Sequence, residues 1–168
     1  MDSVGTWLCF INMSRRLAIL LALAPYLFAQ QSNKGWYRTP SIHGDTIAFS
    51  AEGDLWLVGA AGGLARRLTT HPGDETDPIF SPDGSTIAYI ANYEGPYEIY
   101  TMPANGGVPA RRTFEGGDMS GLAGWTPDGK ILYATHTFSG LPDARLATID
   151  SANVIQQLPL NLGCTGLL

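Results

Sequence analysis

The chain has 168 residues, a formal net charge of −5 and 45% hydrophobic residues, enough for a buried core. The acidic balance argues against nucleic acid as a partner. The only two cysteines, Cys9 and Cys164, are in no metal-ligand spacing and imply neither a disulfide framework nor a zinc site. With 20 glycines, 11 prolines and 15% charged residues, the composition is typical of turn-rich β structure.

The first 29 residues have the pattern of a secretory signal. Arg15 and Arg16 precede an apolar run at 17–24, and the sequence then reaches Ala29. A basic patch, a short apolar stretch and a small-residue end predict cleavage after Ala29 and export to the periplasm or beyond the cell. A buried helix or an uncleaved anchor are the alternatives, but the run is too short for a stable membrane span. Residues 1–29 are therefore interpreted as an N-terminal extension plus a signal helix.

The stretch from 78 to 113 predicts four short antiparallel strands. Pro82-Asp83-Gly84 is a tight-turn signal, because Pro presets the first central φ and Gly accepts a positive φ. Asn105-Gly106-Gly107 is a second turn signal, since both turn residues tolerate positive φ. The apolar and β-branched runs between these turns favour strands. The predicted strands are 78–80, 86–90, 98–102 and 110–113.

The same pattern recurs on both sides at a fixed period. Gly62 and Gly106 are 44 positions apart, and Asp83 and Asp128 are 45 apart. A period in the forties with strand content indicates a β-propeller of four-stranded blades. The expected blades within residues 30–160 are 36–69, 77–113 and 122–160, joined by polar connectors, and 161–168 form a truncated tail.

Three blades form only part of a ring, since propellers close with four to eight. We expect two apolar blade faces to remain exposed, including side chains from 87–90 and 131–133. Exposed patches of that size find a partner or aggregate. The sequence therefore predicts self-association of the chain when it is expressed alone.

No catalytic residue or cofactor site is predicted. The sequence lacks a Gly-x-Ser-x-Gly elbow, and His43, His71 and His136 fall at turns or strand ends. The connector that contains Asp74, Glu75 and Asp77 could contact Ca²⁺ or a cationic peptide, since hard cations take carboxylate oxygens. Its spacing is not that of an EF-hand, and we interpret it as a solvated turn between blades.

Two groups of side chains recur at equivalent positions of the blades. The arginines of the fourth strands could bind phosphate or another acidic ligand, but charges on an outer strand also oppose edge-to-edge pairing, which we favour. The aromatic side chains on apolar strands are interpreted as inter-blade core rather than a stacking platform. These residues are Arg66, Arg67, Arg111, Arg112, Trp56, Tyr100 and Trp125.

From about Trp36 to Pro159 the sequence resembles the N-terminal propeller of tricorn-type serine peptidases. The Ser-Pro-Asp-Gly phrase is shared with TolB-like and prolyl-oligopeptidase-type propellers, whereas the run from Ile42 to Gly73 is more specific. The matching phrases are IHGDTIAF at 42–49, AEGDLW at 51–56, ARRLTTHPG at 65–73, FSPDG at 80–84 and GWTPDG at 124–129.

The resemblance implies a six-bladed propeller, about half of which this chain covers. In the family this propeller precedes a seven-bladed one, a PDZ-like domain and the peptidase core, and the propellers filter peptides. No position here matches that core, so no catalytic residue is carried over. The expected function is gating or docking of peptides, with peptides or downstream domains of the same protein as partners. A TolB-like periplasmic scaffold that binds proteins is the alternative, and a prolyl-oligopeptidase-type propeller is a third.

Overall fold

The computed structural model describes residues 35–117, 119–139 and 144–160. In this part of the chain there are twelve strands and no helix, hence no helix that could cross a membrane. The described strands all belong to the compact unit that begins at Trp36. The predicted signal helix and the tail 161–168 lie outside the described residues.

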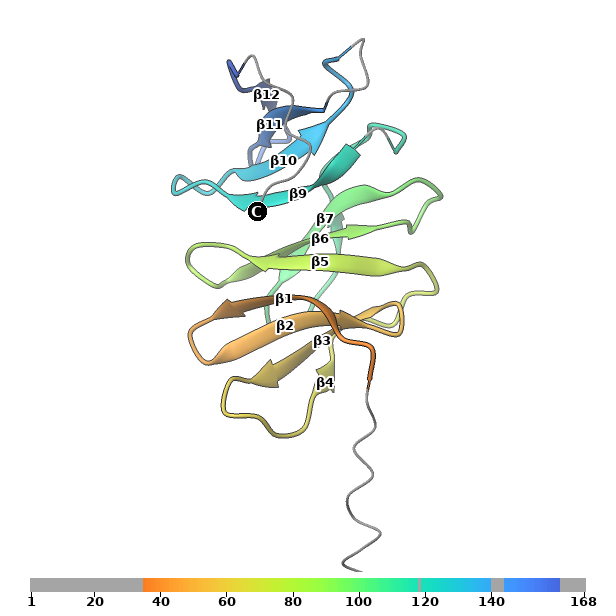
Figure 1. Ribbon diagram of the computed structural model, residues 1–168, viewed down its shortest axis with the longest axis vertical. Coiled ribbons are helices and arrows are strands. Elements are labelled where there is room, and N and C mark those ends of the chain that lie inside the picture. Colours follow the sequence, from red (N-terminus) through yellow and green to blue (C-terminus); the bar gives the residue numbers. More distant parts are fainter. Residues whose placement is uncertain (1–34, 118, 140–143, 161–168) are drawn as a thin grey trace, which may run out of the picture. The chain divides into compact units, whose positions relative to one another are not determined.

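The strands form three four-stranded antiparallel sheets, each built from consecutive strands (Figure 1). Blade one contains β1 (Arg38–His43), β2 (Thr46–Ala51), β3 (Asp54–Gly59) and β4 (Arg66–Arg67). Blade two contains β5 (Glu75–Phe80), β6 (Thr86–Ala91), β7 (Glu98–Pro103) and β8 (Ala110–Arg111). Blade three contains β9 (Met119–Trp125), β10 (Ile131–Thr135), β11 (Arg145–Ile149) and β12 (Ile155–Gln157).

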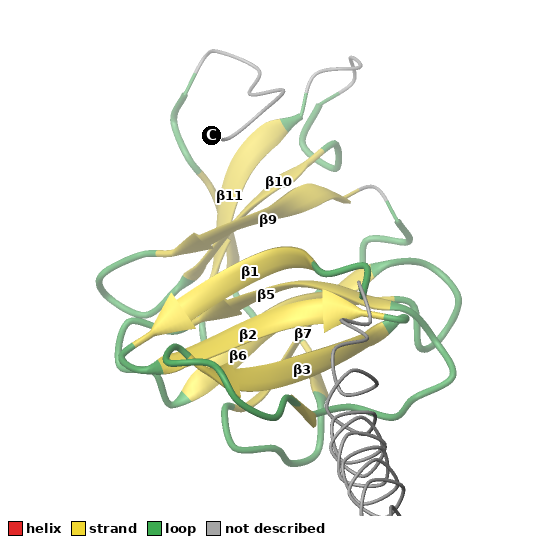
Figure 2. Ribbon diagram, turned by 60° about the horizontal axis from the view of Figure 1, so that its bottom comes forward, coloured by secondary structure: helices red, strands yellow, loops and turns green. Residues whose placement is uncertain are grey.

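The first strands of the blades, β1, β5 and β9, lie side by side (Figures 1 and 2), and each short fourth strand is the opposite edge strand of its sheet. The prediction of an all-β fold with four-stranded antiparallel blades is confirmed. Both connectors lie earlier in the sequence than predicted, because β4 ends at Arg67 and β8 at Arg111, whereas β5 already begins at Glu75 and β9 at Met119. Pairing of Glu75 with Ala91 extends the first strand of blade two into the region expected to be a loop.

Blade two is buried on both faces, because alternate side chains of β6 point into two different cores. Ile87 and Tyr89 belong to the core shared with blade one, whereas Ala88 belongs to the core shared with blade three. Successive side chains of a strand point to opposite faces, so a wholly apolar β6 suits a sheet covered on both sides. The prediction that 87–90 would be exposed is wrong, because these residues lie in the central blade of the three.

Blade three buries one face against blade two. Ile131 and Tyr133 pack with Ile99 in the second core and are almost fully buried. The prediction that 131–133 would be exposed is therefore wrong for these two side chains. Leu132, which alternates with them on β10, is half-buried.

The face of blade one that points away from blade two is the open one. Ile47 of β2 and its cross-strand partner Val58 of β3 are only half-buried. Phe49 is covered by the exposed Tyr37, with the ring centroids 5.3 Å apart and the rings nearly perpendicular. An apolar face of blade one therefore borders solvent.

The turn at Pro82-Asp83-Gly84 forms as predicted. The Gly84 N–H donates to the Ser81 carbonyl at 2.8 Å, and Gly84 has a φ of 70°. A Cβ at Gly84 would lie 2.1 Å from Nδ1 of His43, so glycine also allows the β1–β2 turn to approach blade two. The second turn differs from its prediction, because Gly106 but not Asn105 has a positive φ.

Candidate functional site

Blades one and two repeat one polar arrangement between their third and fourth strands. In blade one, Arg67 of β4 forms an ion pair with Asp54, the first residue of β3. In blade two, Arg111 of β8 forms an ion pair with Glu98, the first residue of β7, at 3.1 Å. Both acids are almost completely buried, at 5% and 0% exposure of the side chain. Each pair fixes a short fourth strand to the rest of its blade.

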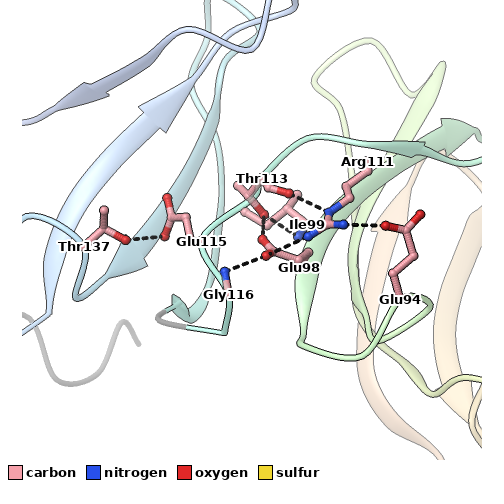
Figure 3. A network of polar contacts seen from close by, with 8 residues as sticks. All are labelled: Glu94, Glu98, Ile99, Arg111, Thr113, Glu115, Gly116 and Thr137. Carbon is pink, nitrogen blue, oxygen red and sulfur yellow. Dashed lines mark hydrogen bonds and ion pairs between the residues drawn. The ribbon is translucent and has the colours of Figure 1, made fainter.

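A threonine two residues beyond each arginine completes the arrangement. The Thr69 hydroxyl accepts from the Leu55 N–H at 2.9 Å, and the Thr113 hydroxyl accepts from the Ile99 N–H at 2.8 Å. The Thr113 hydroxyl in turn donates to Glu98, as Figure 3 shows. These threonines therefore supply the hydrogen bonds that β3 and β7 need where the outer strands end.

Hydrogen bonds to Glu98 outweigh the cost of its burial. Burial raises the pKa of this carboxyl, but donation from Thr113, backbone N–H groups and Arg111 holds the pKa below its usual value. The Gly116 N–H is one of these donors, at 2.9 Å (Figure 3). Glu98 is therefore a charged anchor between blade two and the connector to blade three.

Blade three does not repeat the arrangement. Arg145 is opposite Thr135 in the position that Asp54 and Glu98 occupy, and Gln157 is opposite Ala147 where the arginines would be. The connector from blade two is instead held by Glu115, whose carboxylate accepts from the hydroxyls of Tyr133, Thr135 and Thr137.

Glu75 is the most deeply buried carboxylate of the acidic connector, at 1% exposure. It accepts from Tyr93 Oη at 2.6 Å, from the Leu55 N–H at 3.3 Å and from the Thr69 hydroxyl. All three donors are neutral, and no ion pair reaches Glu75 among the described residues. Burial raises its pKa, partly offset by these bonds. The interpretation of this residue as part of a solvated turn is wrong, since it joins blade two to blade one.

The other two acids of the connector lie apart from Glu75. Asp74 is exposed, and its N–H donates to Asn92 at 2.7 Å. Asp77 has a φ of 53° in a bulge of β5, and burial raises its pKa. In the described ranges no group of three His, Cys, Asp or Glu side chains is arranged to hold a metal ion.

A groove of about 600 Å³ runs between blades one and two, beside the connector. Leu68, His71 and Pro72 line it on the side of blade one. The side of blade two contributes Tyr93, Glu94, Tyr100, Met102 and Arg111. Sequence analysis did not predict this groove, because the residues of its two walls are separated in the sequence by the strands β5 and β6. The repeated ion pairs did leave a signal in the sequence, the spacing of 13 residues shared by Asp54–Arg67 and Glu98–Arg111.

The histidines singled out from the sequence belong to different parts of the fold. The imidazole of His43 is 3.3 Å from the Pro82 carbonyl, whereas His71 contacts the Tyr93 ring at 4.1 Å between centroids. His136 follows β10 in blade three. The structure does not bring these three side chains together into one site.

Most of the recurring arginines bind partners within their own blade or in the next blade. Arg67 and Arg111 bind buried acids, and Arg112 donates to the Asp150 carbonyl at 2.6 Å across blades two and three. Arg66 is exposed on β4, as edge protection requires. Arg67 and Arg111 therefore also bind partners inside the blade, which the sequence did not predict, and edge protection remains a prediction for the outer strands.

The aromatic side chains divide between two environments. Tyr100 is 4% exposed in the first core, and Trp125 packs on the second core. Trp56 is half-buried, and its indole donates to the Ala51 carbonyl within blade one at 3.1 Å. Trp56 therefore does not belong to the cores between blades, contrary to its interpretation from the sequence.

A comparison with protein families gives one match that covers most of the chain. Residues 34–166 match the model of the tricorn protease N-terminal beta propeller domain. The chain belongs to this family. Its membership agrees with three consecutive four-stranded blades and confirms the resemblance to tricorn-type propellers.

Two proteins similar to this tricorn-type propeller are much longer than the chain. Tricorn protease homolog 1 of Streptomyces coelicolor is 35% identical over 103 residues, which cover 61% of this chain and 10% of that protein. The crystal structure of the tricorn protease superposes with a TM-score of 0.65 at 26% identity, covering 77% of this chain and 14% of that one. TolB from Acinetobacter baumannii has a TM-score of 0.62 at 21% identity, covering 77% and 33%. The chain thus spans about a tenth of the length of Tricorn protease homolog 1.

Proposed function

We propose that this tricorn-type propeller segment gates or docks peptides for a serine peptidase core that lies outside the chain. The observation that carries the proposal is the family match over 34–166, which covers all three blades. Two features of the fold support it: a groove of suitable size between blades and a set of first strands, β1, β5 and β9, that lie side by side. The blades themselves would bind peptide without cleaving it.

The test separates binding from hydrolysis. A fluorogenic peptide library is added to the purified full chain, and both anisotropy and released fluorophore are followed. We expect binding of some peptides and no turnover. Turnover that survives repurification and disappears after a Ser→Ala change within residues 35–160 would contradict the proposal, as would the absence of any bound peptide.

Export is the second part of the proposal, and it depends on the sequence of residues 13–29. Arg15 and Arg16 followed by the apolar run are the supporting pattern. N-terminal sequencing of material secreted by an expressing cell should begin at Gln30. A mature protein that retains Met1 would contradict export through a cleaved signal.

A TolB-like scaffold that binds protein partners is the second candidate function. The likeness to solved TolB supports it only at the level of the fold, because the identity is 21%. The coding sequence downstream of Leu168 distinguishes the two candidates. A second propeller followed by a peptidase core supports the first candidate, whereas a stop after six blades supports the second.

A further inference from the structure

We propose that the groove between blades one and two binds a basic side chain, lysine or arginine, of a peptide segment. The aliphatic stem would lie against Tyr93 and Tyr100, and the cationic end would bind Glu94 at the rim. The choice of a peptide as the carrier of this side chain rests on the proposed function. The choice of a cation rests on the groove itself.

The wall of the groove is aromatic. The Tyr93 ring is 4.1 Å from His71 and 4.6 Å from Tyr100 between centroids, and Met102 lies beside them. Aromatic faces attract cations through the ring quadrupole, and the methylene stems of lysine and arginine cover apolar surface while the charged end stays near water. A side chain with both parts therefore suits a groove that has an apolar wall and a polar rim.

The charges around the groove leave an excess of negative charge. Glu75 lies behind Tyr93, accepts a hydrogen bond of 2.6 Å from its hydroxyl and has only neutral hydrogen-bond donors. Glu94 at the rim is 67% exposed. Among the described residues, Arg111 is the one lysine or arginine on the groove wall, and it already donates to Glu94, to Glu98 and to the Thr113 carbonyl.

Arg111 therefore already has partners, and its single positive charge can neutralise only one of the two carboxylates that it binds, Glu94 and Glu98. Its guanidinium also lies 4.4 Å from the Phe114 ring centroid. An incoming ammonium or guanidinium group would offset the carboxylate that remains unbalanced. Glu75 adds to this attraction from behind Tyr93, because a charge is screened less in the interior than at the surface.

The groove does not lie where further blades would pack to close the ring. Both walls come from consecutive blades that are already packed together through Leu55, Leu57, Tyr89 and Tyr100. Further blades would add at the outer faces of blades one and three and not between one and two. The site is therefore formed within the described residues.

The test compares two peptides that differ by one charge. Fluorescein-labelled acetyl-Gly-Ala-Lys-Ala-Gly-amide and its norleucine counterpart are titrated with the purified full chain. We expect the lysine peptide to bind about five to ten times more tightly. Glu94→Gln, at the exposed rim, should remove most of this preference without affecting folding, and Glu75→Gln should reduce it. Glu115→Gln is the matched control, a polar-bonded glutamate at the other blade junction that should leave the preference unchanged.

The outcomes separate this inference from the proposed function. Equal binding of both peptides, or no effect of Glu94→Gln, would overturn the cation site and leave peptide docking intact. Failure of all peptides to bind, while acetyl-lysine-amide with a free ε-amino group still shifts the tyrosine resonances of the chain, would overturn peptide docking and keep the cation site. Loss of the preference in Glu115→Gln would also overturn the site.

Discussion

The indole N–H of Trp125 donates a hydrogen bond of 3.1 Å to the carbonyl oxygen of Ile79. Trp125 ends β9 of blade three, and Ile79 lies in β5, the first strand of blade two. One side chain thus joins the first strands of neighbouring blades, next to the bulge that interrupts the pairing of β5 with β6 between Thr76 and Ile79. Contacts between blades in this propeller are therefore polar as well as apolar.

Trp125→Phe should loosen blade three. The substitution keeps an aromatic ring but leaves the Ile79 carbonyl without its donor, which costs about 1–3 kcal/mol of unfolding free energy. Amide hydrogen exchange should accelerate in β10 and β11. Trp56→Phe is the control, because its indole bonds to Ala51 within blade one. Equal acceleration of blade three in both variants would contradict a bond specific to the blade junction.

Thr113→Val should destabilise the chain by about 1–3 kcal/mol, measured by urea denaturation. Valine has nearly the same shape, but the Ile99 N–H loses its acceptor and Glu98 loses a donor in a fully buried place. Thr101→Val on the same blade is the matched control, because Thr101 is half-buried and its change should stay within about 0.5 kcal/mol. Similar losses in both variants would show that the polar arrangement adds nothing specific.

Glu98 and Glu75 should affect the pH dependence of stability in opposite directions. The pKa of Glu98 is lowered in the folded state, so its contribution is present above the ordinary value of 4.5 and is lost as pH falls through the lowered pKa. The pKa of Glu75 is raised, so its contribution is fully present below 4.5 and is lost as pH rises through the raised pKa.

The measurement is urea denaturation from pH 3 to 8 of the wild type and two variants. The stability that the wild type has over Glu98→Gln should shrink as the pH falls. The stability that it has over Glu75→Gln should grow as the pH falls. Parallel changes in the two comparisons would contradict the opposite environments of these two carboxylates.

The strands could be predicted because their signals are local. Pro82-Asp83-Gly84 fixes a turn through the φ preferences of its own residues. The alternating or wholly apolar runs on either side of this turn favour strands. The two turn signals and the repeat period of 44 to 45 residues predicted the number of strands in a blade. Burial was harder to assign, since a run such as 87–90 reads the same in a central blade as in an outer one.

The polar arrangement could not be predicted because its partners come from separate strands. Glu75 follows Asp74 in a stretch that resembles a loop, and its burial depends on Tyr93 and Thr69 reaching it from two blades. An arginine on an outer strand is equally compatible with edge protection and with a buried acid. Only the ion pair between Arg67 of β4 and Asp54 of β3 reveals the buried acid.

The open face of blade one leads to the last prediction, that the chain associates with itself. Ile47 and Val58 face away from blade two and are half-exposed at the centre of the sheet. Leaving an interface of about 600 Å² uncovered forfeits about 15 kcal/mol as an upper estimate, comparable with the stability of a whole domain. Blade faces of this kind should therefore pair between copies or aggregate.

Sedimentation velocity of the purified full chain tests this prediction. The wild type should sediment as a dimer or larger species, and Ile47→Lys should shift it toward the monomer, because a charge would have to be buried in the contact. Leu64→Lys adds the same charge at a turn residue that is 97% exposed, and it should leave the association unchanged. A monodisperse wild-type monomer that melts cooperatively above about 55 °C would show that the three blades are stable without a partner.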